Sequence, residues 1–144
     1  MNGVSHEYCQ SVPLSKYAAT LAGLYPSSPL ACLEADEIVA IVHELWDKIA
    51  TTDGKVPESR EKYGTETAGK YLRVLASRLK DGPFFAGAAS PQWADLWVYA
   101  YVQFFTSGFF DHLPKNFVEV SSPEMWAHYN AVQESEMFKL YGTL

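Results

Sequence analysis

The spacing of apolar side chains divides most of the chain into segments with a helical pattern. Between Ser28-Pro29 and the turn at Asp53-Gly54, apolar residues recur every three or four positions: Leu30, Leu33, Ile38, Ile41, Val42, Leu45 and Ile49. A serine that can cap the first turn, followed by a proline at the first helical position, is typical of a helix start. The pattern therefore predicts one long amphipathic helix that begins at this dipeptide and ends near Asp53-Gly54.

The same criteria predict four more helices. A short one spans 11–22, and a longer one spans 59–80 and stops at Asp81-Gly82-Pro83. A central helix runs from near Ser90-Pro91 to about residue 107, and its apolar and aromatic residues occupy nearly every side, so we expect it to be buried all round. The last begins at Ser122-Pro123 and continues to about residue 141. The chain contains no internal repeat.

One dipeptide does not fit the helical pattern. Asn2-Gly3 favours a β-hairpin turn, yet only one residue precedes it. The first strand of such a hairpin would therefore lie outside this chain.

Composition narrows the class of protein. The 144 residues are 48% apolar and 19% charged, which excludes a disordered chain of low hydrophobicity and suggests one domain. Aromatic residues make up 15%, more than the core needs, so some should line a pocket or an interface. A net charge of −6 argues against nucleic acid and against anionic membrane surfaces as partners. The longest apolar stretch is shorter than the roughly 20 residues of a membrane span.

The residues that usually carry chemistry form no recognisable constellation. Cys9 and Cys32 could form at most one disulfide, and no Cys/His spacing suggests a metal site. The four histidines, His6, His43, His112 and His128, have no spacing typical of zinc ligands or a catalytic triad, and we expect them to be surface or packing residues. With no secretory signal visible, we expect a reduced compartment, the cytoplasm.

Four short motifs, in this order, resemble the cytosolic glutathione S-transferases. They are Asn2-Gly3 followed by Gln10-Ser11, Gly23-Leu24-Tyr25-Pro26, Phe85-Ala86-Gly87 with Trp93-Ala94-Asp95-Leu96, and Trp126-Ala127-His128-Tyr129-Asn130-Ala131-Val132. The resemblance implies an all-α fold, the helical bundle of the family's C-terminal domain, over residues 25–144. It also implies that residues 1–24 are a remnant of the thioredoxin-like N-terminal domain.

The resemblance implies a set of ligand-binding residues. Gln10 and Ser11 match the pair that holds the γ-glutamyl group of glutathione at a helix start, and the alternative role for Ser11 is a plain helix cap. Glu44 matches an acidic position that reaches the γ-glutamyl amine bound by the neighbouring subunit, or it is a solvated carboxylate. Trp46 lies where the family binds the hydrophobic substrate, or it packs in the core.

Two further residues have an expected structural role. Asp95 would lie at the third position of the central helix and accept backbone N–H bonds there, stabilising the fold. The family usually has Ser or Thr three residues earlier, where this chain has Gln92, so we expect Ser90 to take over part of the capping.

The resemblance implies conjugation of glutathione to small hydrophobic electrophiles by a cytoplasmic homodimer, without a metal. The reaction needs a residue that stabilises the glutathione thiolate, because a free thiol titrates near about 8.5. In the family that residue lies early in the thioredoxin-like domain, far from Tyr8 and Cys9, so we assign no catalytic residue. The alternative is a non-catalytic interaction module of the kind found in elongation-factor and aminoacyl-tRNA synthetase complexes.

Overall fold

The computed structural model describes residues 7–80 and 82–141, and in that part of the chain the fold is all-α, as predicted. The Asn2-Gly3 turn lies outside the described residues. The elements are α1 (Ser11–Leu21), α2 (Pro29–Ala50), α3 (Pro57–Lys62), the π-helix η1 (Tyr63–Ala68), α4 (Gly69–Ala76), the 3₁₀ turn η2 (Phe85–Gly87), α5 (Trp93–Ser107), α6 (Phe117–Ser121), α7 (Pro123–Glu134) and α8 (Glu136–Tyr141).

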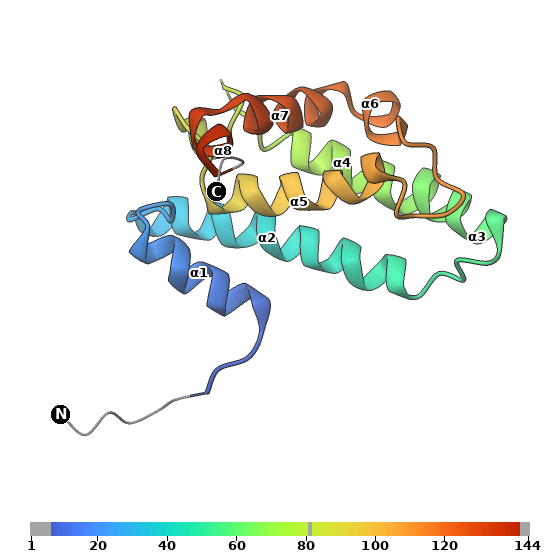
Figure 1. Cartoon of the computed structure of the whole chain (residues 1–144), viewed down its shortest axis with the longest axis horizontal. Helices are drawn as coiled ribbons and strands as arrows, with labels where there is room; N and C mark the ends of the chain where they lie inside the picture. The colour runs from blue at the N-terminus through green and yellow to red at the C-terminus, as the bar shows by residue number, and fades with distance from the viewer. Residues whose placement is uncertain (1–6, 81, 142–144) are drawn as a thin grey trace.

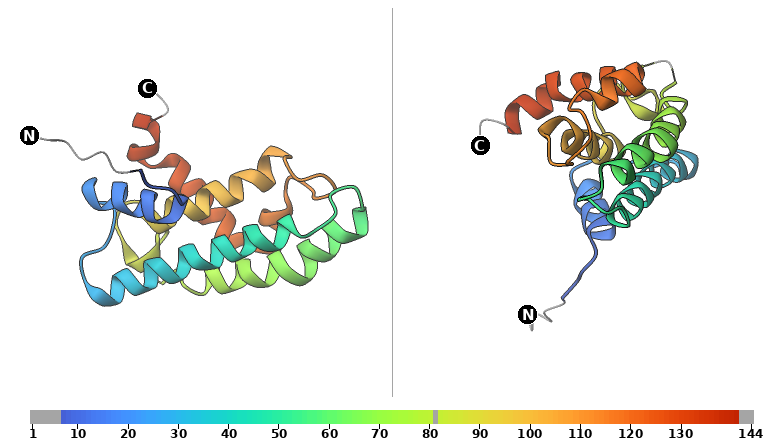
Figure 2. Two further views of the ribbon diagram at one scale, coloured as in Figure 1. Left: turned by 90° about the horizontal axis from the view of Figure 1, so that it is seen from below. Right: turned by 90° about the vertical axis from the view of Figure 1, so that its right-hand side faces the viewer.

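The bundle is organised around α5. Helices α2 and α5 lie side by side and run in the same direction, while α4 and α7 run the opposite way (Figure 1). Helix α1 lies across the end of this pair where α2 and α5 begin (Figures 1 and 2). The core fills the space between these helices and includes Leu45, Leu72, Val98, Phe105 and Met125.

Helix α2 begins where the sequence predicts. The Oγ atom of Ser28 accepts a hydrogen bond from the backbone N–H of Ala31 at 3.3 Å, and Pro29 occupies the first turn. The helix ends at Ala50, a few residues before the expected turn, because the hydroxyls of Thr51 and Thr52 donate to the carbonyls of Lys48 and Ile49.

The predicted helix over 59–80 is not one continuous α-helix. It begins at Pro57, widens into a π-helix between Tyr63 and Ala68, and returns to α-helix until Ala76. In a π-helix the residues five apart share a face, so Tyr63 and Ala68 both reach the core. Gly64 allows this widened turn to approach Leu113 and Phe117 closely.

The prediction that the central helix is buried all round is wrong. Along α5, Ala100, Gln103 and Ser107 are exposed, and Trp97 and Phe104 are only half-buried. The sequence pattern does not reveal this exposed face, because aromatic side chains occur on the protein surface as well as in the core.

The C-terminal region differs from the single helix that the sequence predicts. The backbone of Ser135 is extended, so α7 ends at Glu134, and the Oγ of Ser135 accepts a hydrogen bond from the N–H of Phe138 at the start of α8. The expected helix is thus two helices. The short helix α6, which precedes them, has no signal in the apolar pattern.

Candidate functional site

The first candidate site is the start of α1. Ser11 is its first residue and Gln10 its N-cap, and both side chains are exposed. Gln10 has φ 80° and ψ 118°, a region of backbone conformation that residues other than glycine rarely adopt and that costs about 1–3 kcal/mol. The first backbone N–H groups of a helix have no partner within it, so this end of α1 can receive an anion.

A hollow of about 510 Å³ adjoins this helix start. Its lining residues flank Gln10 and Ser11 in the chain and are mostly apolar: Tyr8, Cys9, Pro13, Leu14 and Tyr17. A helix end that can receive an anion, next to an apolar hollow, suits a ligand that carries both a carboxylate and an apolar group.

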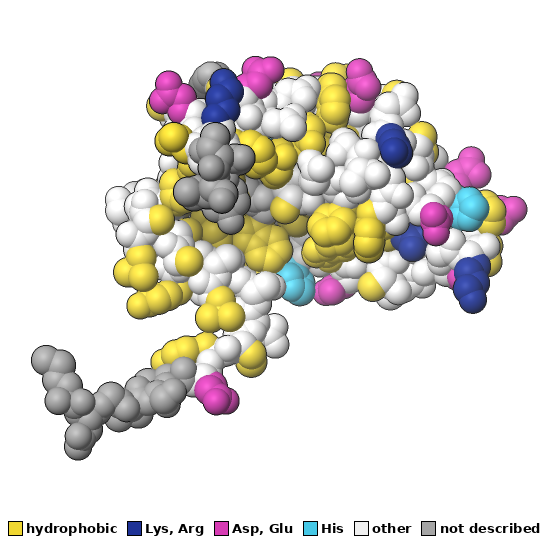
Figure 3. Space-filling view, in the orientation of Figure 1, with side chains coloured by type: hydrophobic (Ala, Val, Ile, Leu, Met, Phe, Trp, Pro, Cys, Tyr) yellow, Lys and Arg dark blue, Asp and Glu magenta, His cyan; other side chains and the backbone are white. Residues whose placement is uncertain are grey.

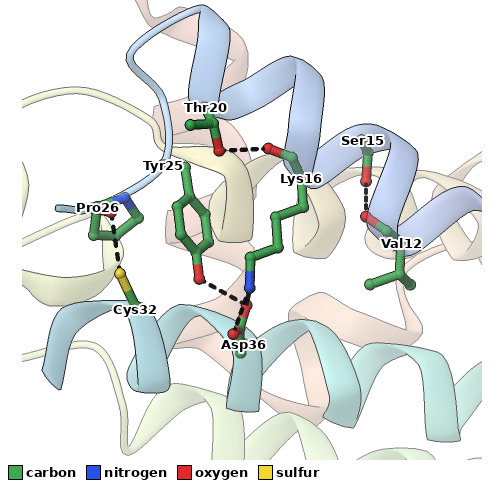
Figure 4. Close-up of polar contacts among 8 residues, drawn as sticks. All are labelled: Val12, Ser15, Lys16, Thr20, Tyr25, Pro26, Cys32 and Asp36. Atoms are coloured by element: carbon green, nitrogen blue, oxygen red, sulfur yellow. Dashed lines mark hydrogen bonds and ion pairs between the residues drawn. The ribbon is translucent and has the colours of Figure 1, made fainter. Parts of the chain in front are cut away.

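A charged contact ties α1 to α2 and to the linker between them (Figure 4). The ammonium group of Lys16 lies 2.7 Å from Oδ2 of Asp36, and the hydroxyl of Tyr25 donates to Oδ1 of the same carboxylate at 3.0 Å. The hydrogen bond with Asp36 raises the pKa of Lys16. The ammonium group also lies 4.6 Å from the centre of the Tyr25 ring, a cation–π contact.

Glu44 is exposed on the side of α2 that faces α4. The hydroxyl of Tyr71 donates to its Oε1 at 2.6 Å, and Lys48 lies 3.1 Å from the same oxygen. These two contacts, the Tyr71 hydrogen bond first, hold the pKa of Glu44 below its ordinary value. The carboxyl group is therefore ionised at neutral pH, and Tyr71 fixes its orientation, a contact that the sequence does not indicate.

Trp46 lies on a different side of α2 and belongs to an aromatic cluster. Its ring centre is 4.7 Å from that of Phe104 and 5.8 Å from that of Phe110. Phe109 extends the cluster outward, with 66% of its surface exposed. Hydrophobic side chains gather over α1 and along the face between α2 and α5 (Figure 3). Trp46 thus packs against the core and also contacts Phe104, which in turn contacts the exposed Phe109.

Asp95 lies at the third position of α5 and is completely buried. Its Oδ2 accepts from the backbone N–H of Gln92 at 2.7 Å, and its Oδ1 accepts from the backbone N–H of Phe85 at 2.9 Å. The N-cap is Gln92, whose side chain donates to the carbonyl of Ser90 at 3.3 Å. Ser90 therefore lies two residues before the N-cap and is exposed.

His128 has a buried partner that the sequence does not indicate. It lies on α7, with Nε2 2.9 Å from Oδ1 of Asp95 and its ring 5.0 Å from that of Phe85. The buried Nδ1 has no hydrogen-bond partner among the described residues. Because His128 lies 33 positions away from Asp95, no local motif could have revealed the pair.

The described residues offer neither a metal site nor a membrane span. Between residues 7 and 141, leaving out position 81, no three His, Cys, Asp or Glu side chains are arranged to hold a metal ion. Over the same residues, no helix has the length and apolar character that crossing a bilayer requires.

The comparisons with known proteins agree with the fold. A family model described as the C-terminal domain of glutathione S-transferase matches residues 41–142, more than half of the chain. No curated protein matches. The match covers α4, α5 and α7 and most of the helical core, and it begins after α1.

Proposed function

Since this chain belongs to the glutathione S-transferase family through its C-terminal domain, we propose that it binds glutathione and serves the conjugation of glutathione to small hydrophobic electrophiles. In this proposal residues 25–144 form the helical domain, and residues 1–24 belong to the thioredoxin-like domain. The working form is a cytoplasmic homodimer that detoxifies electrophiles and needs no metal.

The backbone of Gln10 is the observation that carries the proposal. Its φ of 80° costs conformational energy at an exposed position, where nothing in the core requires it. The conformation leads the chain into α1, where the hydroxyl of Ser11 and the backbone N–H groups of Ser11 and Val12 are available together, while Pro13 has no N–H and that of Leu14 bonds to the carbonyl of Gln10. A γ-glutamyl carboxylate is an anion of suitable size for this helix end.

The remaining contacts are proposed for the rest of the two substrates. Glu44 is ionised and oriented by Tyr71, which suits it to the ammonium group of a glutathione held by a second subunit. The cluster of Trp46, Phe104 and Phe109 offers flat apolar surface to an aromatic electrophile.

Calorimetric titration of the 144-residue chain with glutathione tests the ligand site. Ser11→Ala should weaken binding by on the order of ten-fold, because it removes a hydrogen bond to a charged group. Ser77→Ala is the matched control, since the Ser77 hydroxyl donates only to the carbonyl of Val74 on α4. A wild-type chain that does not bind glutathione, or a Ser11→Ala variant that binds equally well, contradicts the proposed site.

The non-catalytic interaction module is the second candidate. The observation that favours it is the exposure of Leu21 at the end of α1 and of Leu30 and Leu33 near the start of α2, with 65–72% of each residue's surface exposed. Conjugation of a chloronitrobenzene distinguishes the two roles when the chain is supplied with an intact thioredoxin-like domain of the family. Product formed faster than in the absence of protein favours the enzyme, and no such product favours the module.

A further inference from the structure

One hydroxyl group of α1 binds two side chains of α5. Ser15 lies one helical turn after Ser11, and its Oγ accepts a hydrogen bond from Nε1 of Trp93 at 3.0 Å and another from Nε1 of Trp97 at 3.1 Å. The same hydroxyl donates to the carbonyl of Val12 at 3.0 Å (Figure 4).

These three bonds use the whole capacity of the hydroxyl. Serine has one hydrogen to donate and two lone pairs to accept with, and all are engaged. Trp93 and Trp97 are four residues apart on α5, so their indoles leave the helix on the same face and converge on one oxygen atom. An oxygen held from three directions has little freedom to move.

The Trp93 indole is itself fixed. It is buried, and its ring meets that of Tyr25 edge to face at 5.5 Å. Tyr25 in turn bonds to Asp36, which holds Lys16, the neighbour of Ser15 on α1. The first half of α1 is thus fixed by a connected set of polar contacts, while its buried surface is small: Ala19 is the buried residue that the helix contributes.

We propose that Ser15 is a positioning residue for the ligand site at Gln10 and Ser11, a role that rests on the function proposed above. By accepting both indole N–H groups, Ser15 sets the direction of the first turn of α1 relative to α5. The carboxylate of the ligand is then held at a fixed place with respect to the aromatic surface of α2 and α5, where the second substrate is proposed to bind.

The two indoles also make the contact observable. Indole emission responds to the hydrogen bond at Nε1, so a ligand that binds one turn away at Ser11 should change the fluorescence of Trp93 and Trp97. A hydroxyl that only stabilises the fold would not make the emission depend on ligand.

Three variants test the role in the 144-residue chain. Ser15→Ala should weaken glutathione binding by on the order of ten-fold and abolish the ligand-dependent change in emission. Ser15→Thr keeps the hydroxyl and should retain both. Thr20→Ala is the matched control, because the Thr20 hydroxyl lies on the same helix and donates only to the carbonyl of Lys16. Melting temperatures, measured beside the affinities, show whether each variant is folded.

The outcomes separate the two proposals. If the wild-type chain binds glutathione and folded Ser15→Ala binds it equally well, the positioning role is overturned and the proposed function stands. If the wild-type chain binds no glutathione and its emission is unchanged, the proposed function fails and the role of Ser15 fails with it. If Ser15→Ala does not fold, an affinity of folded Trp97→Phe equal to that of the wild type overturns the role, because this variant removes one of the two indole donors.

Discussion

The Nε2 atom of His128 on α7 lies 2.9 Å from Oδ1 of Asp95 on α5, and both side chains are completely enclosed. Asp95 also accepts the backbone N–H groups of Phe85 and Gln92, so a single carboxyl group joins the η2 turn, the start of α5 and the middle of α7. The η2 turn, the start of α5 that soon follows it and α7, 33 residues further along the chain, therefore depend on one side chain.

Removing that side chain should be costly. Asp95→Ala should lower the free energy of unfolding by about 3–5 kcal/mol, because it strands His128 and two backbone donors without an acceptor. Urea unfolding measures this as a lower midpoint at an unchanged slope. The exposed carboxyl of Asp47 gives the control, since Asp47→Ala should cost less than about 0.5 kcal/mol. Equal midpoints for the two variants would exclude the joining role of Asp95.

The hydrogen bond from Tyr71 should control the titration of Glu44. Since this bond and Lys48 lower the pKa of Glu44 in the folded chain, any stability it contributes is present above the ordinary value of 4.5 and is lost as the pH falls through the lower folded value. Tyr71→Phe should raise the pKa of Glu44 toward 4.5, measured by NMR of the side-chain carboxyl. Tyr99→Phe, which removes a hydroxyl bonded to Gln103, should leave it unchanged. An equal pKa of Glu44 in the wild type and in Tyr71→Phe would refute the role of this hydrogen bond.

Two buried phenols should make the fold sensitive to alkali. The hydroxyl of Tyr63 donates to the carbonyl of Leu45 at 3.0 Å and lies 2.6 Å from the hydroxyl of Tyr101. Burial raises the pKa of Tyr63 to about 12 and that of Tyr101 well above the ordinary value of 10.0. Their contribution to stability is complete below about pH 10 and is lost as the pH rises through the folded values.

The free energy of unfolding should therefore decline from about pH 10 upward. Phenolate absorbance should show that Tyr63 and Tyr101 ionise late or only on unfolding, together with Tyr99, whose pKa burial raises to about 12. Tyr63→Phe should remove part of this decline and cost about 1–2 kcal/mol at neutral pH. Replacing the exposed Tyr17 by Phe should change neither quantity. If Tyr63 and Tyr101 ionised together with the exposed tyrosines at about pH 10, the burial of their hydroxyl groups would be disproved.

The π-helix should depend on a glycine. A Cβ atom at Gly64 would lie 3.0 Å from Cδ2 of Leu113 and 3.2 Å from Cε2 of Phe117. Gly64→Ala should therefore destabilise the protein by about 1–3 kcal/mol through overpacking. Gly82→Ala meets no atom within 4 Å and should be tolerated. Thermal unfolding of the two variants compares them, and an equal or higher melting temperature for Gly64→Ala would show that the contact can relax.

Capping residues and prolines in the sequence are enough to predict where some of the helices begin. Ser28-Pro29 marks the start of α2, and the acid at the third position of α5 is enough to predict that Asp95 caps this helix. The π-helix escapes prediction because it accompanies a tertiary contact, the close approach of Gly64 to Leu113. The break at Ser135 is local: its hydroxyl bonds to the backbone of Val132 and Phe138, which the spacing of apolar residues does not reveal.

The candidate site likewise has one part that the sequence predicts and another that it does not. Gln10 and Ser11 can be proposed from a motif, whereas the bond of Tyr71 to Glu44 and those of Trp93 and Trp97 to Ser15 join residues 27 to 82 positions apart. Such pairs follow no periodicity in the sequence. They form only when the helices pack together.

The attachment of α1 has a consequence for the order in which the molecule opens. It is attached to the bundle by a few polar side-chain contacts around Ser15 and Lys16, by the buried Ala19 and by the half-buried Val12, whereas α5 contributes seven buried residues to the core. Helix α1 should therefore detach in a separate, low-energy opening while the rest of the bundle stays folded. In native-state hydrogen exchange its amides would then exchange with solvent long before those of α5, and a ligand that bridges α1 to the bundle would slow them selectively.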